Sequence, residues 1–425
     1  MRIVFSTFGT AGDVNPLIGL SLELKRRGHT PVIAAPELFR SKVEPLGLEF
    51  AAVRPDQDPT NRQLVAMIYD IKHGTERGLR EFLFPSIRES YQDLLAAVTA
   101  KGGADLLVAG ELAYAAPIVA EVTGLRWASY VLAPFSFFSA YDPPMLPPYP
   151  ILSKVQPILP GMGRLIAHFA RHKTRDWPEP IYALRRELGL ARGRNPIFDA
   201  KHSDALVLAL FSRVLGEPQR DWPQQTRVTG FVYYDGDADA KDLSPELKTF
   251  LLSGEPPIVF TLGSAAVLDP GNFYEVSARV AERLGRRAVL LVGSDAANLS
   301  LAGLPPSIIV ASYAPYSQIM PYASVIVHQG GVGTTAQALR AGKPMLVMPY
   351  SHDQPDNARR VERLGVAQVV RRSQYSVQTA ERALRKLFAD PAYARRAAQI
   401  AEQVRSEDGL HLACDAIEAL LAQRQ

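Results

Sequence analysis

The segment His328-Gln329-Gly330-Gly331-Val332-Gly333-Thr334-Thr335 joins an apolar strand, expected at 325–327, to a helix expected at 334–341. A helix that starts in this way offers unpaired backbone N–H groups and the positive end of its dipole, and both attract anions. Three glycines let a ligand approach the backbone closely, and the imidazole of His328 can donate to a phosphate oxygen. We therefore expect a phosphate site here, in preference to a histidine with a purely structural role.

The same alternation of strands and helices extends on both sides of this segment. Short apolar strands with helices between them predict a parallel sheet, because parallel strands need crossover connections. In the second half the expected strands are residues 258–262, 288–292, 308–311, 325–327 and 345–348. The first half begins in the same way, with strands at 2–6 and 31–35 joined by a glycine turn at 9–12 and a helix at 16–27. We expect an α/β protein with two doubly wound sheets.

The chain is long enough for two domains, since its 425 residues exceed the roughly 250–300 that one core holds. A polar, turn-rich stretch at 234–239 places the boundary near residue 235, which predicts the domains 1–235 and 236–425. Residues 141–160 contain seven prolines, and we expect 141–175 to be an irregular region that covers a binding site. The last helix, at 411–421, is expected to pack back on the first domain.

Charge and cysteine content exclude several classes of protein. A net charge of +4, with basic and acidic residues interleaved, is too small to indicate a nucleic-acid-binding protein. The single cysteine, Cys414, rules out an internal disulfide and suits a reducing compartment, so we expect a cytoplasmic protein. No cluster of histidines and cysteines predicts a metal site. The apolar run at 127–138 is far shorter than the about 20 residues that cross a bilayer.

Two common phosphate-binding motifs do not fit the chain. No Gly-Lys-Ser/Thr follows the glycines after His328, so a Walker loop is excluded. The turn Gly9-Thr10-Ala11-Gly12 lacks the third glycine of a dinucleotide fingerprint, and the second strand ends in Ala34-Ala35-Pro36 instead of an acidic residue. A diphosphate held without a P-loop lysine or a pair of metal-binding carboxylates points to a nucleotide whose diphosphate is a leaving group.

Three further segments each allow a structural and a functional interpretation. Asp13 stands at a helix start, where a carboxylate either caps the helix or faces the crevice at the strand ends, and its spacing favours the cap. Asp353-Gln354 follows a strand and offers the groups that sugar hydroxyls need, but a capping turn explains the pair equally well. Tyr313 and Tyr316, near another strand end, either stack on a nucleobase or simply pack.

Taken in order, these segments resemble a large family of glycosyltransferases. It includes UDP-glucuronosyltransferases, plant secondary-metabolite glucosyltransferases, and bacterial macrolide and glycopeptide glycosyltransferases. The matching residues are Gly12 to Pro16 in the first half and Tyr313-Ala314-Pro315, His328 to Thr335, Ala338, Gly342-Lys343-Pro344, Pro349, Asp353-Gln354 and Asn357 in the second. Within the family, Asp221-Trp222-Pro223-Gln224 and Phe260 to Ser264 are similar to the rhamnosyltransferases of bacterial rhamnolipid synthesis and their sterol and macrolide relatives.

The resemblance implies a GT-B fold, in which two Rossmann-like domains face each other across a cleft. Residues 236–425 would bind a UDP- or dTDP-sugar, with Tyr313 on the base, His328 at the diphosphate, and Asp353-Gln354 on the sugar. The donor-binding residues implied in this way are Gly12, Ser264, Tyr313, Ala314, His328, Gly330, Gly331, Gly333, Thr334, Asp353 and Gln354. Transfer would be a direct displacement with inversion, without a metal ion or another cofactor.

The general base departs from the common pattern of the family. Many members have a histidine where this chain has Asp13, and the aspartate that orients such a histidine is replaced by Gly110, next to Glu111. The glycopeptide branch uses a carboxylate instead. The resemblance therefore makes Asp13 the expected catalytic base, although an unperturbed aspartate, with a pKa of about 3.9, is a weak one.

The acceptor is expected to be a lipophilic small molecule, such as a natural product, a sterol-like compound or a hydroxy-fatty-acid lipid. The expected acceptor-binding residues lie near strand ends of the first domain and are Phe135, Phe138, Met145 and Tyr149. The basic segment 161–175 is compatible with weak peripheral membrane contact, but a solvated helix face explains it better. Rival functions are a catalytically silent nucleotide-sugar-binding protein and a GT-B nucleotide-sugar epimerase. The sequence is compatible with a monomer and with a homodimer.

Overall fold

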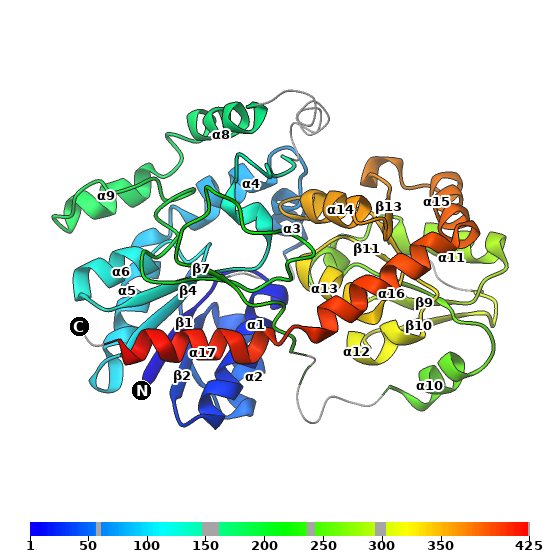
Figure 1. Cartoon of the computed structure of the whole chain (residues 1–425), viewed down its shortest axis with the longest axis horizontal. Helices are drawn as coiled ribbons and strands as arrows, with labels where there is room; N and C mark the ends of the chain where they lie inside the picture. The colour runs from blue at the N-terminus through cyan, green and yellow to red at the C-terminus, as the bar shows by residue number, and fades with distance from the viewer. Residues whose placement is uncertain (57–60, 147–160, 235, 237–242, 294–302, 424–425) are drawn as a thin grey trace. The chain divides into compact units, whose positions relative to one another are not determined.

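The computed structural model describes residues 1–56, 61–146, 161–234, 236, 243–293 and 303–423. The chain divides into two units, each with its own parallel sheet (Figure 1). The first unit comprises Met1–Asp58, His73–Tyr234 and Glu407–Gln425, and the second comprises Pro59–Lys72 and Asp235–Ser406. A boundary near residue 235 would put residues 61–72 in the first domain. The structure instead places them in the second unit, because Tyr69 packs against its core.

The first unit is built on a sheet whose described strands are all parallel, in the order β3-β2-β1-β4-β5-β6-β7. Its strands are β1 (Arg2–Ser6), β2 (Thr30–Ala35), β3 (Glu49–Ala52), β4 (Leu106–Gly110), β5 (Trp127–Val131), β6 (Val207–Ala209) and β7 (Thr226–Val228). The order reverses between β1 and β4. Ligands of such sheets bind at the carboxyl ends of the strands at this reversal, so the loops after β1 and β4 are the expected binding point.

Helices cover both faces of this sheet, because side chains of its central strands alternate between the faces. Among the described residues, the α-helices of the unit are α1 (Ala11–Arg26), α2 (Arg40–Val43), α4 (Gly74–Arg77), α5 (Ile87–Thr99), α6 (Ala116–Thr123), α8 (Met162–Lys173), α9 (Glu179–Glu187) and α17 (Gly409–Ala422). Ile3 and Phe5 of β1 pack with α1 and α17 on one face. Val4 packs with α5 and α6 on the other.

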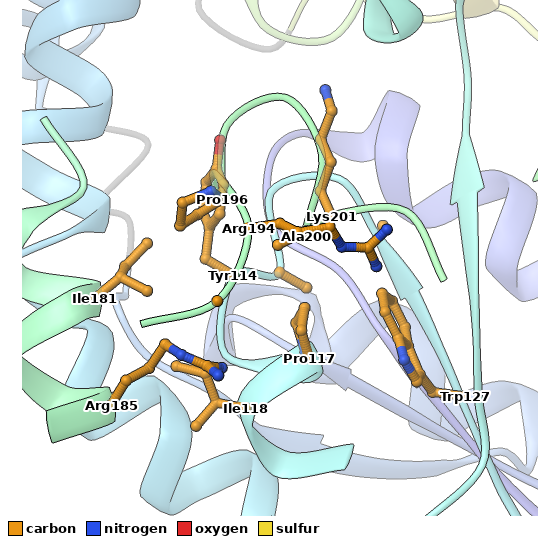
Figure 2. A pocket seen from close by; sticks show the side chains of 13 residues that line it. Tyr114, Pro117, Ile118, Trp127, Ile181, Arg185, Arg194, Pro196, Ala200 and Lys201 are labelled. Atoms are coloured by element: carbon orange, nitrogen blue, oxygen red, sulfur yellow. The ribbon is translucent and has the colours of Figure 1, made fainter. Parts of the chain in front are cut away.

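A small cavity lies in the first unit beside the end of β4 and the start of α6 (Figure 2). Tyr114, Pro117, Trp127, Arg185 and Lys201 are among the side chains that line it. Its volume of about 30 Å³ has room for water but not for an organic substrate.

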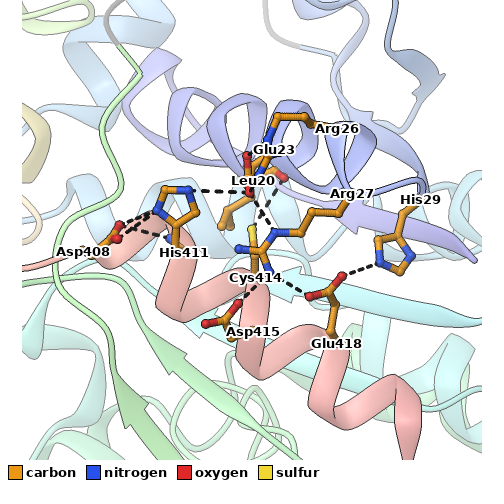
Figure 3. Close-up of polar contacts among 10 residues, drawn as sticks. All are labelled: Leu20, Glu23, Arg26, Arg27, His29, Asp408, His411, Cys414, Asp415 and Glu418. Carbon is orange, nitrogen blue, oxygen red and sulfur yellow. Dashed lines mark hydrogen bonds and ion pairs between the residues drawn. The ribbon is translucent and has the colours of Figure 1, made fainter.

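The C-terminal helix α17 lies against α1 of the first unit (Figure 3). Ala413 and Ile417 are buried in the same cluster as Leu20 and Leu24. At the rim, Arg27 Nη1 donates to Asp415 at 2.6 Å and to Glu418 at 2.7 Å, and His29 pairs with Glu418 at 2.9 Å (Figure 3). Ion pairs at a surface contribute about 0–1 kcal/mol each, so the apolar contact between the two helices does most to hold α17 in place.

The second unit carries a parallel sheet whose described strands follow the order β10-β9-β8-β11-β12-β13. Its strands are β8 (Ile258–Thr261), β9 (Ala288–Leu291), β10 (Ile308–Ala311), β11 (Val325–His328), β12 (Met345–Val347) and β13 (Ala367–Val369). Here the order reverses between β8 and β11. The loops after these two strands therefore meet where an open α/β sheet binds its ligand.

Helices and one inserted segment complete the second unit. The helices are α3 (Arg62–Ile68), α10 (Pro245–Leu252), α11 (Phe273–Leu284), α12 (Tyr316–Ile319), α13 (Val332–Ala341), α14 (Gln354–Arg363), α15 (Val377–Ala389) and α16 (Pro391–Ser406). The core joins Phe260 of β8 to Tyr274 and Val280 of α11, with Leu384 of α15. Helix α3 belongs to the inserted segment, which comes from between β3 and α4.

Candidate active site

The glycine segment lies at the reversal point of the second unit. His328 is the last residue of β11, and α13 begins at Val332, after the first two glycines. Gly330 has a φ of +86°, a left-handed conformation that favours glycine. Gly331 is the N-cap of α13 and supplies no side-chain acceptor. The first N–H groups of the helix have no intrahelical partners, which makes this end of α13 suited to an anion.

His328 is fully buried and neutral. Burial lowers the pKa of its imidazole to about 3, so the ring carries a single proton at neutral pH. The backbone N–H of Gly330 donates to Nδ1 at 3.1 Å, which assigns the ring proton to Nε2. Nε2 is buried and has no hydrogen-bond partner among the described residues. A buried N–H without an acceptor is costly, so His328 is suited to donate to a phosphate oxygen.

Gln329 ties the glycine segment to the loop after β8, a role that the sequence pattern does not predict. A Cβ atom on Gly263 would lie 2.3 Å from Gln329 Nε2, and one on Gly331 would lie 2.7 Å from the same atom. The φ of Gly263 is +68°. Both positions are therefore glycine because the Gln329 amide fills the space between the two loops.

Asn357 joins the glycine segment to the expected sugar-binding carboxylate. It is fully buried, and its Nδ2 donates to the carbonyl of Gly330 at 3.0 Å and to Asp353 Oδ2 at 2.7 Å. Asp353 is the N-cap of α14, but its side chain makes no capping hydrogen bond, so the alternative of a capping turn does not explain it. Gln354 is buried and accepts from the backbone N–H of Tyr350 through Oε1 at 3.0 Å. The structure thus brings Asp353 beside the glycine segment.

The expected residues after β8 and β10 differ in exposure. Tyr313 is 68% exposed, and a residue that stacks on a base needs an accessible ring face. Ser264 is exposed in the turn after β8, where its hydroxyl is accessible to a ligand. Ala314 is buried and has no polar side chain, so it can contribute only backbone atoms and packing.

Thr334 links the start of α13 to two neighbouring elements. Its buried side chain hydrogen bonds with Tyr316 of α12. The Tyr316 hydroxyl also hydrogen bonds with Thr261 of β8 at 2.7 Å. Thr334 therefore fixes the first turn of the helix, in which Gly333 precedes it with open space where a side chain would lie.

Asp13 lies at the reversal point of the first unit, in the first turn of α1. The helix begins at Ala11, earlier than the start expected at residue 16, because Thr10 and Asp13 form a capping box. The backbone N–H and the hydroxyl of Thr10 donate to Asp13 Oδ2 at 2.7 and 3.1 Å. Gly12, expected at the donor, already donates its N–H to Thr10 Oγ1 at 3.1 Å.

The environment makes Asp13 a better base than an ordinary aspartate. Burial raises its pKa to about 6, in opposition to the hydrogen bonds from Thr10, and the charge of Glu111 adds to the rise. The side chain is nevertheless partly exposed. Oδ1 takes part in neither hydrogen bond from Thr10. One side chain can therefore cap α1 and still accept a proton.

Tyr130 explains why position 110 holds no carboxylate. A Cβ atom on Gly110 would lie 2.6 Å from Tyr130 Oη, which donates to Thr7 at 2.8 Å. This hydroxyl fills the space at the end of β4 where an aspartate side chain would begin. The absence of that aspartate is therefore built into the packing of β4 against β5.

Both oxygens of the neighbouring carboxylate, Glu111, are engaged by partners other than Asp13. Lys201 donates to Glu111 Oε2 at 2.8 Å, and Ser136 donates to Oε1 at 2.7 Å. Burial acts to raise the pKa of Glu111, but the charge and hydrogen bond of Lys201 keep it below its ordinary value. Glu111 is therefore a permanent negative charge on the same sheet edge.

The expected acceptor-binding residues are only partly brought together. Phe135 and Phe138 lie edge to face at 5.2 Å, after β5. Phe138 also packs edge to face on Phe198, 5.0 Å away, as part of the core, so much of its ring serves packing. Met145 is half-buried in a segment without regular secondary structure. Tyr149 lies outside the described residues. Of the described residues among them, Phe135, Phe138 and Met145, none lines the small cavity of Figure 2.

Over the described residues, no group of three or more histidine, cysteine, aspartate and glutamate side chains is arranged to hold a metal ion. Within the same ranges, no helix is long and apolar enough to cross a membrane.

Comparison with known proteins decides the family. Residues 3–135 match the glycosyltransferase family 28 N-terminal domain, and residues 277–412 match the C-terminal domain of erythromycin biosynthesis protein CIII-like sequences. The chain is 32% identical over 434 residues to O-mycaminosyltylonolide 6-deoxyallosyltransferase of Streptomyces fradiae, which covers 98% of this chain and 97% of that protein. The chain belongs to the natural-product glycosyltransferases. The resemblance read from the sequence is thereby confirmed, and this glycosyltransferase is an enzyme.

Solved structures confirm the GT-B fold of this glycosyltransferase. The kitacinnamycin glycosyltransferase is similar with a TM-score of 0.73 and 22% identity, over 99% of each chain. The spinosyn rhamnosyltransferase complexed with thymidine diphosphate is similar with a TM-score of 0.69 and 18% identity, over 98% of this chain and all of that one. At these identities the likeness establishes the fold of both sheets and leaves the substrates to be argued from the site.

Proposed function

We propose that this glycosyltransferase moves a hexose from a dTDP- or UDP-sugar to a hydroxyl of a lipophilic small molecule, with inversion at the anomeric carbon. The observation that carries the proposal is the unpaired Nε2–H of His328 beside the start of α13. A neutral donor and a helix N-terminus together stabilise a diphosphate leaving group as its charge develops. This arrangement supports a metal-independent reaction without another cofactor.

The donor would lie along the carboxyl edge of the second sheet. The exposed ring of Tyr313 offers a surface for the base, and the glycine segment faces the diphosphate. Asp353 would accept hydrogen bonds from sugar hydroxyls. Gln354 would contribute its amide N–H groups, since its Oε1 already accepts from Tyr350. The thymidine diphosphate bound by the spinosyn rhamnosyltransferase supports a dTDP-sugar as the first donor to test.

Asp13 would act as the general base. The acceptor hydroxyl loses its proton to Asp13 as its oxygen attacks the anomeric carbon. The bond between that carbon and the diphosphate oxygen breaks at the same time, and the electron pair leaves with the nucleoside diphosphate. Partial burial and the charge of Glu111 support this role, because they raise the basicity of Asp13 while leaving it ionised at neutral pH.

The acceptor is proposed to be lipophilic, on the basis of the partly exposed Phe135 and the half-buried Met145 in the first unit. A cytoplasmic reaction is also proposed, because the chain has one cysteine, which is buried and unpaired. Sedimentation with vesicles of phosphatidylcholine and phosphatidylglycerol would test weak membrane contact through the basic helix α8.

The test is a thermal-shift panel of dTDP-glucose, dTDP-rhamnose and UDP-glucose, followed by mass spectrometry with a mixture of lipophilic acceptors. We expect at least one donor to stabilise the protein and one acceptor to gain the mass of a hexosyl residue, both in the presence of EDTA. Binding without transfer to any acceptor would favour a silent nucleotide-sugar-binding protein. Conversion of the donor sugar to its epimer would favour an epimerase, and either result would contradict the proposal.

A further inference from the structure

The inserted segment 61–72 has its own contacts within the second unit. Its helix α3 is capped by Asn61, whose side chain accepts from the N–H of Leu64 at 3.0 Å. The residue after the helix, Tyr69, is partly buried and packs against the core of the second unit. A segment from the first quarter of the chain therefore becomes part of the donor-binding unit.

The ring of Tyr69 contacts the loop that precedes Asp353. It lies edge to face with Tyr350 at 6.2 Å and 89°, and with His352 at 5.7 Å and 72°. Tyr350 is itself fixed from other sides. It is 1% exposed, its hydroxyl donates to the carbonyl of Asp269 at 3.1 Å, and the guanidinium of Arg372 lies 3.9 Å from its ring centre. Tyr69 is thus the partner of Tyr350 that the inserted segment supplies.

His352 shows that this loop needs support. Its φ is +58°, a left-handed conformation that residues with side chains rarely adopt and that persists where the surroundings impose it. The ring of His352 is held by Tyr69 and by a hydrogen bond with the backbone of Ile68, both from the inserted segment. The next residue along the chain is Asp353. A change at Tyr69 therefore acts on the backbone that presents the carboxylate.

We propose that Tyr69 is a positioning residue of the donor-sugar site, whose ring holds the loop Tyr350–Gln354 so that Asp353 stays beside the glycine segment. This inference rests on the proposed role of Asp353 and Gln354 in binding the sugar. Tyr69 acts through the loop and does not touch the reacting atoms. It follows that the sugar-binding end of the site depends on a segment from the region that matches the N-terminal family domain, and not on residues 236–425 alone.

The test compares binding of dTDP-glucose and UDP-glucose with binding of dTDP and UDP by isothermal titration calorimetry. Tyr69→Ala should weaken the sugar nucleotide roughly three- to tenfold, the size of an aromatic pair contact, and leave the free nucleotide within about twofold. Tyr69→Phe, which keeps the ring, should retain both affinities. Tyr322→Ala removes a half-exposed tyrosine elsewhere in the same unit and serves as the matched control.

Two results would overturn the inference. In one, Tyr69→Ala binds the sugar nucleotide as tightly as the wild type. In the other, it loses affinity for the free nucleotide to the same extent, which indicates a general loss of structure. Tyr69→Leu keeps apolar volume without an aromatic edge, and the same selective loss is expected of it if the alanine variant does not fold. A wild type that neither binds nor uses any nucleotide sugar would refute the proposed function as well, which separates the two failures.

Discussion

The rate of sugar transfer should depend on the ionisation of Asp13, with an acid limb centred near pH 6. Asp13→Asn is the informative change, because its amide oxygen can still accept from the N–H of Thr10 and so preserve the start of α1. It removes only the ability to take a proton. Asp13→Ala removes the proton acceptor and the capping contact together, so comparison of the two variants separates catalysis from helix stability.

The magnitude follows from the shifted pKa. With a pKa of about 6, roughly a tenth of the enzyme carries ionised Asp13 at pH 5, so kcat/KM should lie about tenfold below its plateau. An unperturbed aspartate would be almost fully ionised at that pH and would leave the rate unchanged. Loss of the base in Asp13→Asn should lower kcat about 10²–10⁴-fold, the usual contribution of a general base.

The effect of Asp13 on stability has the opposite sign to its effect on the rate. Its pKa is higher in the folded chain than in the unfolded chain, so the folded state binds the proton more tightly. The group therefore favours folding at low pH, and this contribution is lost as the pH rises from about 4 through about 6. Asp13→Asn cannot ionise and should be at least as stable as the wild type at pH 7.5.

The assay is initial-rate kinetics from pH 5 to 8.5, with dTDP or UDP release measured at saturating donor. Asp408→Asn alters another helix-capping carboxylate of the first unit and should leave the profile unchanged. A rate that stays constant between pH 5 and 7, or an Asp13→Asn variant within tenfold of the wild type, would refute the assignment of the base. Binding of dTDP should survive in both Asp13 variants.

Other predictions concern the second unit. His328→Phe removes the unpaired Nε2–H and should weaken dTDP about tenfold or more in calorimetry, and unchanged affinity would exclude a phosphate contact. Gly263→Ala places a Cβ atom against Gln329 Nε2 and should lower both the melting temperature and the affinity for the sugar nucleotide. In a double-mutant cycle, adding Gln329→Ala should restore part of the lost melting temperature and affinity. Strictly additive effects of the two substitutions would show that the two positions are not in contact. Asn357→Leu removes the amide that donates hydrogen bonds to the buried Gly330 carbonyl and to Asp353. The free energy of unfolding should fall by about 1–3 kcal/mol for each hydrogen bond lost, and KM for the sugar nucleotide should rise. An unaltered urea midpoint would show that the two hydrogen bonds contribute nothing to stability.

The second unit was the more predictable part of the site. The strand expected at 325–327 and the helix expected at 334–341 correspond to β11, which ends at His328, and α13, which starts at Val332. Local sequence signals were sufficient to predict these two elements, because an apolar strand followed by glycines and a helix start can adopt only a few backbone geometries. The resemblance to the family implies that Asp353 and the glycine segment share a site. The hydrogen bonds that join them, from the Asn357 amide, are visible only in three dimensions.

The first half of the chain contains the features that the sequence did not predict. The expected start of α1 was Pro16, because proline is a typical first residue of a helix. The helix instead starts at Ala11, and the spacing of Thr10 and Asp13, which is that of a capping box, was the signal for the earlier start. The placement of Tyr69 in the second unit depends on partners about 280 residues away in the chain, and no local pattern encodes such a contact. Glycine at 110 likewise depends on the hydroxyl of Tyr130 from the neighbouring strand.

Hydrogen–deuterium exchange with and without saturating dTDP would report directly whether the glycine segment binds the donor diphosphate. We expect slower exchange at the backbone amides of residues 329–335, with weaker protection around Asp353, and loss of this protection in His328→Phe at the same nucleotide concentration. Protection confined to the glycine turn at residues 9–12, or unchanged exchange at 329–335 when dTDP is demonstrably bound, would contradict it.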